Sequence, residues 1–313
     1  MFGSPLARQQ PRHEVWSQLR AALRSTNARH QLWGYVFVLP MLVLMVAFKF
    51  IPALEVLWLS FTSWDMLSAP RFVGFDNYVS LVQDPLFQQS IQATLFFVFG
   101  AAIPIWILAL ILGLIFTADL PWKSAVRTLY FLPNILPAVV FAIVWRFLLQ
   151  PYGLLNQGLS LFRIPAIDWL NDVHAVIPAF ILATDWATIP FFMIIYLTAL
   201  QTIPRDYYEA AEIDGASVLQ RLWHITLPQL RPTMLLVVVI SITFLSRVFT
   251  SVLILTNGGP DGASRVLPMF IYQMGFEYFK MGRATAASII FLLGLMVFTI
   301  IQLRLFRDDG RAH

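Results

Sequence analysis

The chain has 313 residues, of which 58% are hydrophobic and 12% are charged, and its mean hydropathy is +0.72. These values exclude an ordinary soluble domain and indicate an integral membrane protein. The lack of cysteine excludes disulfides and thiolate chemistry, and the net charge of +4 is spread over many segments, which argues against a nucleic-acid-binding patch.

The first 31 residues are basic and precede any long apolar run. This pattern predicts a cytoplasmic amino-terminal segment, residues 1–31, in place of a cleaved signal peptide. Apolar residues at helical spacing within it fit either a short helix on the inner membrane surface or a disordered tail. They are Val15, Trp16, Leu19, Ala22 and Leu23.

Residues 32–306 contain six apolar windows, each near or above the ~20 residues that a bilayer core requires. The windows are 32–58, 93–117, 129–149, 175–200, 233–255 and 285–306. They predict an all-α membrane protein with six transmembrane helices and with both termini on one side. That side carries thirteen Lys and Arg residues and the other carries five, so the termini, including the tail 307–313, are expected in the cytoplasm.

The segments on the opposite side contain short apolar pieces with aromatic residues, 75–82 and 270–279. These could lie as helices at the membrane interface or dock an extracytoplasmic partner. A strong turn signal, Asn257-Gly258-Gly259-Pro260, directly follows the fifth window.

A polar segment that favours helix, residues 201–232, separates the fourth and fifth windows. Pro204 suits a first helical turn, and Gly215 offers a left-handed stop. Ser217, with Gln220 three positions later, fits a capping box that begins a second short helix, which Pro228 is expected to end. The sequence therefore predicts a helix, a sharp turn and a second helix on the cytoplasmic side.

Two ionisable residues, Asp185 and Arg247, lie inside predicted spans at depths that differ by only ~3 Å. Charges in spans are costly and are functional candidates by default. We hypothesise that the two pair or face the same water-filled path. An ion pair that only fixes helix packing is the alternative to substrate contact. Arg146 and Lys49 lie nearer the span ends, where long side chains reach the interface.

Prolines interrupt the third and fourth windows, as is tolerated where the backbone lines a cavity or is covered by neighbours. Asn134, Trp145 and Trp186 lie near them. Aromatic faces beside polar groups would suit a sugar, although Trp is also the usual membrane-interface anchor. Anchoring is the better interpretation for Trp145, and both remain open for Trp186.

The chain carries no sign of its own catalysis. A phosphate loop needs Gly-Lys-Ser/Thr, whereas Lys123 precedes Ser124 but follows Trp122. The five histidines are isolated, without a metal or nucleophile motif. We therefore expect neither an enzyme nor a cofactor, and the absence of a phosphate loop fits a permease that borrows its ATPase and equally a channel.

Glu209-Ala210-Ala211, then Gly215, then Ile225-x-Leu227-Pro228 resembles the EAA loop of ABC importer permeases. An ordinary amphipathic connector is the alternative. Three further stretches resemble the carbohydrate branch of these permeases, the MalF and UgpA kind. They are 130–134, 152–156 and 255–260.

The resemblance implies a type I ABC importer permease fold with a cytoplasmic coupling loop. It implies a second, different permease subunit, a homodimeric ATPase and an extracytoplasmic solute-binding protein as partners. The ATPase-coupling residues would be Tyr208, Glu209, Ala210, Ala211, Asp214, Gly215, Ile225, Leu227 and Pro228, and the substrate-path candidates are Asn134, Asp185, Trp186 and Arg247.

By this resemblance the substrate is a di- or oligosaccharide. A polyol or glycerol phosphate is the alternative, and for the phosphate only Arg146 and Arg247 would supply cations to the path. The extra leading spans and the large insertion of the maltose-type subunit are absent, so six spans are expected and maltose is not implied. A stand-alone channel or a secondary transporter is the competing class, although no internal repeat supports it.

Overall fold

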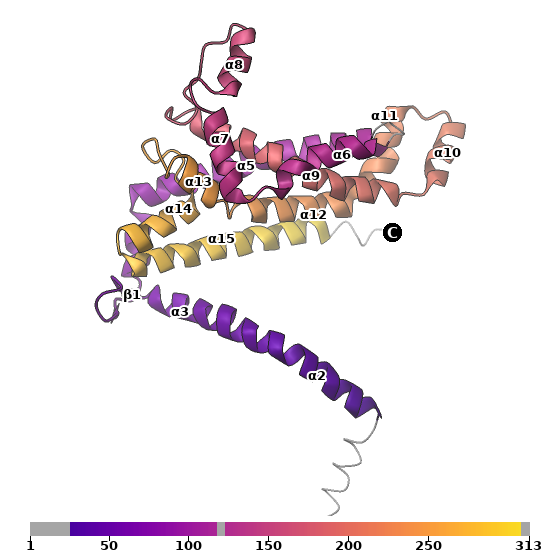
Figure 1. Ribbon diagram of the computed structural model, residues 1–313. Coiled ribbons are helices and arrows are strands. Elements are labelled where there is room, and N and C mark those ends of the chain that lie inside the picture. The colour runs from indigo at the N-terminus through magenta and orange to yellow at the C-terminus, as the bar shows by residue number, and fades with distance from the viewer. Residues whose placement is uncertain (1–25, 118–122, 308–313) are drawn as a thin grey trace, which may run out of the picture. The chain divides into compact units, whose positions relative to one another are not determined.

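The computed structural model describes residues 26–117 and 123–307 and is mostly helical (Figure 1). The expected surface helix near Trp16 and most of the expected tail 307–313 lie outside the described residues. The chain forms two compact units, residues 1–58 and residues 59–313. Each unit is described by itself.

The described part of the first unit is one apolar helix. It consists of α2 (Thr26–Met45), a π-helical turn η1 (Val46–Phe50) and α3 (Ile51–Leu59), which follow one another without a gap. Trp33–Leu59 is long and apolar enough to cross a membrane, in agreement with the first predicted window.

The second unit opens with a small antiparallel ladder, β1 (Thr62–Ser63) and β2 (Arg71–Phe72), in which Thr62 pairs with Phe72. This short ladder is an exception to the all-α fold that we expected. The ladder lies beside α4 (Asp76–Val82), whose Asn77 side chain donates hydrogen bonds to the carbonyls of Ser60 and Thr62. The short helix α4 falls within the predicted piece 75–82.

Four long helices carry the unit: α5 (Pro85–Thr117), α9 (Val176–Gln201), α12 (Leu227–Leu245) and α15 (Met281–Arg307) (Figure 1). The most extensive packing joins α5 to α9, and α12 packs on α5, α9 and α15. Small residues allow the backbones of α5 and α9 to come close. A side chain at Gly113 would put its Cβ only 3.1 Å from the Cβ of Tyr196.

The third predicted span, 129–149, is broken. The helix α6 (Lys123–Phe131) leads into a 3-10 turn η2 (Leu132–Ile135), and α7 (Ala138–Leu148) follows at a bend of 99°. Pro137 explains the break, because it lacks a backbone N–H and holds Leu136 in an extended conformation. Among the described residues there are five helices able to span a membrane, or six if this bent pair counts as one.

The fifth predicted span, 233–255, is also interrupted, which corrects the straight helix that we expected. The helix α12 ends at Leu245, and α13 (Thr250–Leu255) begins after a short break. The break contains neither proline nor glycine. Backbone bonds there tighten to three residues, from the Arg247 N–H to the Phe244 carbonyl and from the Val248 N–H to the Leu245 carbonyl.

Besides the larger core between the long helices, a second apolar core lies at the end of the bundle. It is formed by α4, the first turns of α5, α14 (Leu267–Tyr272) and the start of α15. Phe87 and Phe270 meet at its centre, with ring centroids 5.4 Å apart. A π-helical turn η4 (Gln273–Glu277) continues α14, so the predicted piece 270–279 is largely helical. The predicted turn at Asn257 is present, with positive φ at Asn257 and Gly258.

Candidate functional site: a helical hairpin and two broken spans

A helical hairpin joins α9 to α12 at one end of the bundle. Its first helix is α10 (Arg205–Ile213) and its second is α11 (Val218–Arg221) (Figure 1). Pro204, with φ −58°, stands immediately before α10, one position earlier than a first-turn residue. The described end of α15 lies at the same end of the bundle, whereas α13 and α14 lie at the other.

The turn of the hairpin closes the end of α10 with two backbone bonds. The Ala216 N–H donates to the Ala211 carbonyl at 2.8 Å, and the Gly215 N–H donates to the Glu212 carbonyl at 3.0 Å. This is a Schellman motif, which requires a left-handed residue after the C-cap. Gly215 has φ +78°, as predicted. The chain therefore reverses within three residues.

The second helix begins with the predicted capping box. The Ser217 N–H donates to the Gln220 side chain at 2.7 Å, and the Ser217 hydroxyl accepts from the Gln220 N–H at 3.4 Å. Four backbone donors would otherwise lack partners at this helix start. Local sequence thus sets both sides of the turn.

Pro228 does not end the second helix, contrary to our expectation. The helix α11 runs into a π-helical turn η3 (Leu222–Thr226) and from there directly into α12, so that Val218–Leu245 is one span-length helix. Pro228 falls in the first turn of α12, just after the π-helical turn. A π-helical turn is where a helix accommodates the missing proline N–H.

Two side-chain contacts tie α10 to this continuous helix. Glu212 forms an ion pair with Arg221 across the turn. The Tyr208 hydroxyl lies 3.0 Å from the Thr226 Oγ1, and Thr226 is only 4% exposed. The pairings of Glu212, Arg221 and Thr226 were not predicted, because each joins residues too far apart in sequence for a local motif.

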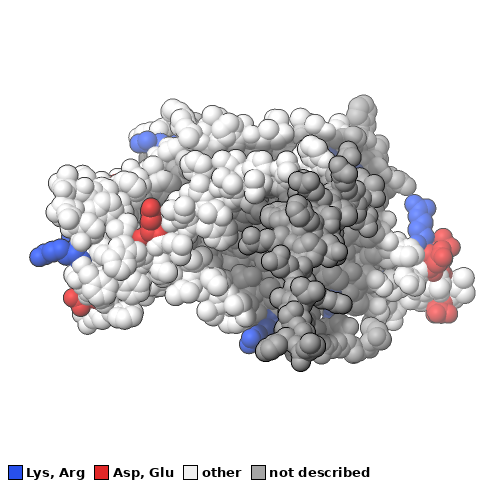
Figure 2. All heavy atoms as spheres, turned by 90° about the horizontal axis from the view of Figure 1, so that it is seen from below, with Lys and Arg blue, Asp and Glu red and all other residues white. Residues whose placement is uncertain are grey.

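The exposed surface of the hairpin combines charge with large apolar side chains. Glu209 and Ala210 are exposed. Ile213 is 87% exposed and Val218 is 75% exposed, and Leu219 and Trp223 are also exposed. Figure 2 shows acidic and basic side chains together at the right-hand end, where the hairpin lies in Figure 1. Exposed apolar groups of this size mark an interaction surface.

A hollow of about 420 Å³ lies between the two helices of the hairpin. Ala211, Asp214, Gly215 and Ile225 line it, and so do Arg221 and His224. Four predicted coupling residues therefore surround one concavity. Leu227 and Pro228 lie one turn further along, at the start of α12.

The structure brings Asn134 to the middle of α9. Its side-chain Nδ2 donates to the Ala187 carbonyl at 3.1 Å, next to Trp186. Trp186 in turn meets Trp145 edge to face, with ring centroids 5.6 Å apart. Trp145 is only 5% exposed, so it is a packing residue and not the interface anchor that we expected. Asn134 and Trp186 thus share one neighbourhood at the bend between α6 and α7.

Asp185 and Arg247 do not form an ion pair. Asp185 is 7% exposed, and its Oδ1 has no hydrogen-bond partner among the described residues. Arg247 is exposed in the break between α12 and α13. The depth argument failed because it assumed that the fifth span is straight as far as residue 255. The structure leaves Asp185 beside Trp186 and places Arg247 in a separate groove.

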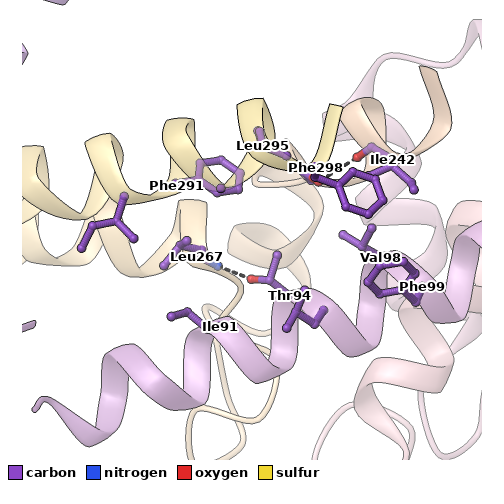
Figure 3. Close-up of a pocket in the computed structure, with 13 residues that line it drawn as sticks. Ile91, Thr94, Val98, Phe99, Ile242, Leu267, Phe291, Leu295 and Phe298 are labelled. Carbon is purple, nitrogen blue, oxygen red and sulfur yellow. Dashed lines mark hydrogen bonds between the residues drawn. The ribbon is translucent and has the colours of Figure 1, made fainter. Parts of the chain in front are cut away.

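A third cavity, of about 270 Å³, lies between α5 and α15 and is almost wholly apolar (Figure 3). Phe291, Leu295 and Phe298 from α15 face Val98 and Phe99 from α5. The few polar atoms of its lining form hydrogen bonds within the chain. The Thr94 hydroxyl oxygen, for example, accepts from the Leu267 N–H at 2.7 Å. This lining offers a sugar no free hydrogen-bonding group. Among the described residues no cluster of His, Asp or Glu could hold a metal ion.

The helical bundle and its exposed hairpin define a multi-pass membrane subunit of the transport class. The chain belongs to the family of binding-protein-dependent transport system inner membrane components, whose model matches residues 109–308 and so includes the entire hairpin. This confirms the resemblance to importer permeases.

Two relatives match the chain over most of its length. The probable ABC transporter permease protein YurN of Bacillus subtilis is 32% identical over 289 residues, which cover 89% of this chain and 97% of YurN. The trehalose/maltose transport system permease protein MalF of Thermococcus litoralis is 32% identical over 284 residues, which cover 88% and 95%. A chain of the bacterial alginate ABC transporter, solved with an alginate pentasaccharide-bound periplasmic protein, has the same fold. It has a TM-score of 0.79 and 24% identity, and the match covers 92% of this chain and 99% of that one.

Proposed function

We propose that this chain is the transmembrane subunit of an ATP-driven, binding-protein-dependent sugar importer, in which the α10–α11 hairpin couples transport to a separate ATPase. The observation that carries the proposal is the hairpin itself. It is locally self-capped, it exposes Ile213 and Val218, and it continues into α12. An exposed apolar surface on a rigid hairpin needs a protein partner.

The contacts of the hairpin indicate how a movement of α10 would be transmitted to α12. A force on α10 is transmitted to the segment just before α12 through the Tyr208–Thr226 contact and the Glu212–Arg221 ion pair. Since the helix from Val218 to Leu245 is continuous, its far end, at the break beside Arg247, moves with it. The coupling set is the one that the resemblance implied, with Glu209 meeting a basic group of the ATPase and Gly215 making the turn.

The remaining parts of the proposal follow from the family. The chain has six spans, with the bent pair α6–α7 as the third, and the hairpin and both termini are cytoplasmic. Its partners are a second permease subunit, a homodimeric ATPase and an extracytoplasmic solute-binding protein, within the lipid of the inner membrane. The transport of trehalose and maltose named for the Thermococcus relative supports a sugar as substrate. Asn134, Asp185, Trp186 and Arg247 are the path candidates.

Co-purification of the complex tests the coupling role. The chain is co-expressed with its ATPase and partner permease, and Glu209→Lys is compared with Glu277→Lys, an exposed carboxylate in η4 far from the hairpin along the chain. We expect Glu209→Lys to lose ATPase retention and substrate-stimulated hydrolysis while its thermal unfolding stays unchanged, and Glu277→Lys to retain the ATPase as the wild type does. Transport that persists without any ATPase would contradict the proposal and favour a channel or a secondary transporter.

A further inference from the structure

Two cavities lie at opposite ends of the helix pair α7 and α13, which pack against each other. The first, of about 510 Å³, is bounded by the last turn of α7, the end of α13 and residues 168–171, and it contains Arg146. The second, of about 620 Å³, is bounded by the start of α7, the end of α12 and the start of α13, and it contains Arg247. We name them the Arg146 cavity and the Arg247 groove.

The two cavities are consecutive along α7. Ala138 lines the Arg247 groove, and Arg146 is eight residues further on, which is ~12 Å along a helix axis. The helix α13 repeats this order, since Thr250 and Ser251 line the groove and Leu253 to Leu255 line the cavity. A solute that passes along this helix pair meets the two arginines one after the other.

The Arg146 cavity has a polar lining. Gln150, Asn171 and Asn257 contribute to it. Asp168 also lines it, but both of its carboxylate oxygens accept from the Asn171 Nδ2, at 3.0 and 3.2 Å. Arg146 makes one long contact, from Nη1 to the Ile254 carbonyl at 3.5 Å. Four of its five N–H donors therefore lack a partner among the described residues.

The Arg247 groove presents a cation without a counter-ion. Arg247 is exposed, its guanidinium makes no hydrogen bond or ion pair among the described residues, and Asp185 is buried elsewhere. An unpaired guanidinium at membrane depth is costly unless it faces water or an anion. Hydroxyl groups of Thr243, Thr250 and Ser251 line the same groove. Such a site suits a ligand that brings both hydroxyls and negative charge.

We propose that the Arg146 cavity and the Arg247 groove are successive binding sites for a sugar that carries an oxyanion, namely a carboxylate, sulfonate or phosphate group. The inference rests on the proposed importer function and specifies its substrate class. A guanidinium binds such planar or tetrahedral oxyanions with two parallel hydrogen bonds. The hydroxyls of a neutral sugar can also accept from a guanidinium, but only an oxyanion gains the charge-assisted, paired hydrogen bonds.

A matched pair of ligands tests this assignment without knowledge of the natural substrate. Trigalacturonic acid and its neutral methyl ester are titrated by saturation-transfer NMR against the purified complex of both permeases and the ATPase in nanodiscs. Arg247→Gln and Arg146→Gln remove the two cations, Arg247→Lys keeps a charge without the planar fork, and Arg71→Gln is the control. Arg71 is an exposed arginine that lines neither cavity.

We expect the wild-type complex to bind the acid about 10-fold or more tightly than the ester, as a charge-assisted contact gives. Arg247→Gln should abolish this preference, Arg146→Gln should reduce it, Arg247→Lys should retain part of it, and Arg71→Gln should leave it unchanged. Equal binding of acid and ester, or no binding of either, overturns the inference. So does loss of the permease pair in Arg247→Gln, which would mean that the partner subunit supplies the counter-ion. If the purified complex lacks the ATPase, that result contradicts the proposed coupling role of the hairpin and not the inference about the two binding sites.

Discussion

The Tyr208 hydroxyl lies 3.0 Å from the Thr226 Oγ1, and this contact joins α10 to the π-helical turn that leads into α12. The Thr226 hydroxyl also donates to the Arg221 carbonyl at 3.4 Å, so Tyr208 acts as the donor to Thr226. Together with the Glu212–Arg221 ion pair, it links the first hairpin helix to the long helix.

Tyr208→Phe removes this link without changing the ring. We expect a loss of about 0.5–1.5 kcal/mol in the local stability of the hairpin, as for one hydrogen bond. Amide exchange in α10 should accelerate, and ATP hydrolysis should become less dependent on substrate. Hydrogen-exchange mass spectrometry checks the first effect. Tyr207→Phe is the control, because Tyr207 is exposed on the same helix. Equal exchange rates in the two variants would contradict the role of the contact.

The substitution Gly215→Ala separates a loss of stability in this chain from a loss of binding to a partner. The backbone at Gly215 has φ +78°, and an added Cβ would meet nothing within 4 Å. We therefore expect only the left-handed penalty of about 1–2 kcal/mol in the isolated chain, and less for Gly215→Asn. Thermal unfolding measures it. If the ATPase docks against this turn, assembly of the complex should weaken by more than that penalty. Equal losses with and without the ATPase would mean that no partner contacts the turn.

Asn156 organises the segment 150–171 that carries α8 (Leu154–Leu161). Its Nδ2 donates to the carbonyls of Gln150, Pro151 and Ile167, and its Oδ1 accepts from the Ile167 N–H and the Trp169 Nε1. Asn156→Ala should cost about 2–4 kcal/mol, because buried donors and acceptors lose their partner. Amide exchange in this segment should rise, whereas Asn171→Ala, which removes only contacts with Asp168, should leave it slow. Unchanged exchange in Asn156→Ala would refute this account.

Asp84 has two functions that one substitution can separate. Its Oδ1 accepts the Leu86 N–H at 2.9 Å at the start of α5, and its Oδ2 lies 2.5 Å from the Arg283 Nη2 at the start of α15. Asp84→Asn keeps the cap and removes the ion pair. In a double-mutant cycle with Arg283→Gln we expect a coupling energy of about 1–3 kcal/mol by denaturant unfolding. A coupling energy near zero would show that the cap is the main contribution of Asp84.

The turn at residues 65–68 should resist acid. Hydrogen bonds from the Ser68 N–H, the Ser68 hydroxyl and the Leu67 N–H hold the pKa of Asp65 at about 2, below its ordinary value of 3.8. Because the folded pKa is the lower one, the carboxylate stabilises the turn fully above pH 3.8 and loses this effect as the pH falls through about 2. A carbon-13 titration of the carboxyl group, assigned with Asp65→Asn, measures the midpoint. A midpoint near 3.8 would mean that these hydrogen bonds do not form in solution.

The hairpin could be predicted from sequence because its signals are local. Gly215 and the Ser217–Gln220 box specify their own backbone, whatever surrounds them. The break after Leu245 could not be predicted, since no proline or glycine marks it and the hydropathy runs on to residue 255. Pro137 signalled an interruption but not a bend of 99°, because packing against neighbouring helices sets the angle.

The role of the path candidates stays a prediction, and the structure adds which of them lie together. Asn134 and Trp186 meet because the α6–α7 bend docks on α9, as interrupted spans do when neighbours satisfy their backbone. The pairing of Asp185 with Arg247 failed because the fifth span is interrupted after Leu245, which the sequence did not signal. The contact between Tyr208 and Thr226 depends on how the hairpin folds back, which no linear motif encodes.

The helix α5 is unbroken over 33 residues, which is ~50 Å and well beyond the ~30 Å of a bilayer core. This continuous helix carries Pro104 in its interior, and where it moves as one body a rotation of about 5° at one end displaces the other end by about 4 Å. The second apolar core packs around the amino-terminal end of α5, and α9 packs against α5. A small reorientation of α5 is therefore enlarged at its far end into a displacement the size of an atom, whereas the broken helices absorb such a change at their joints.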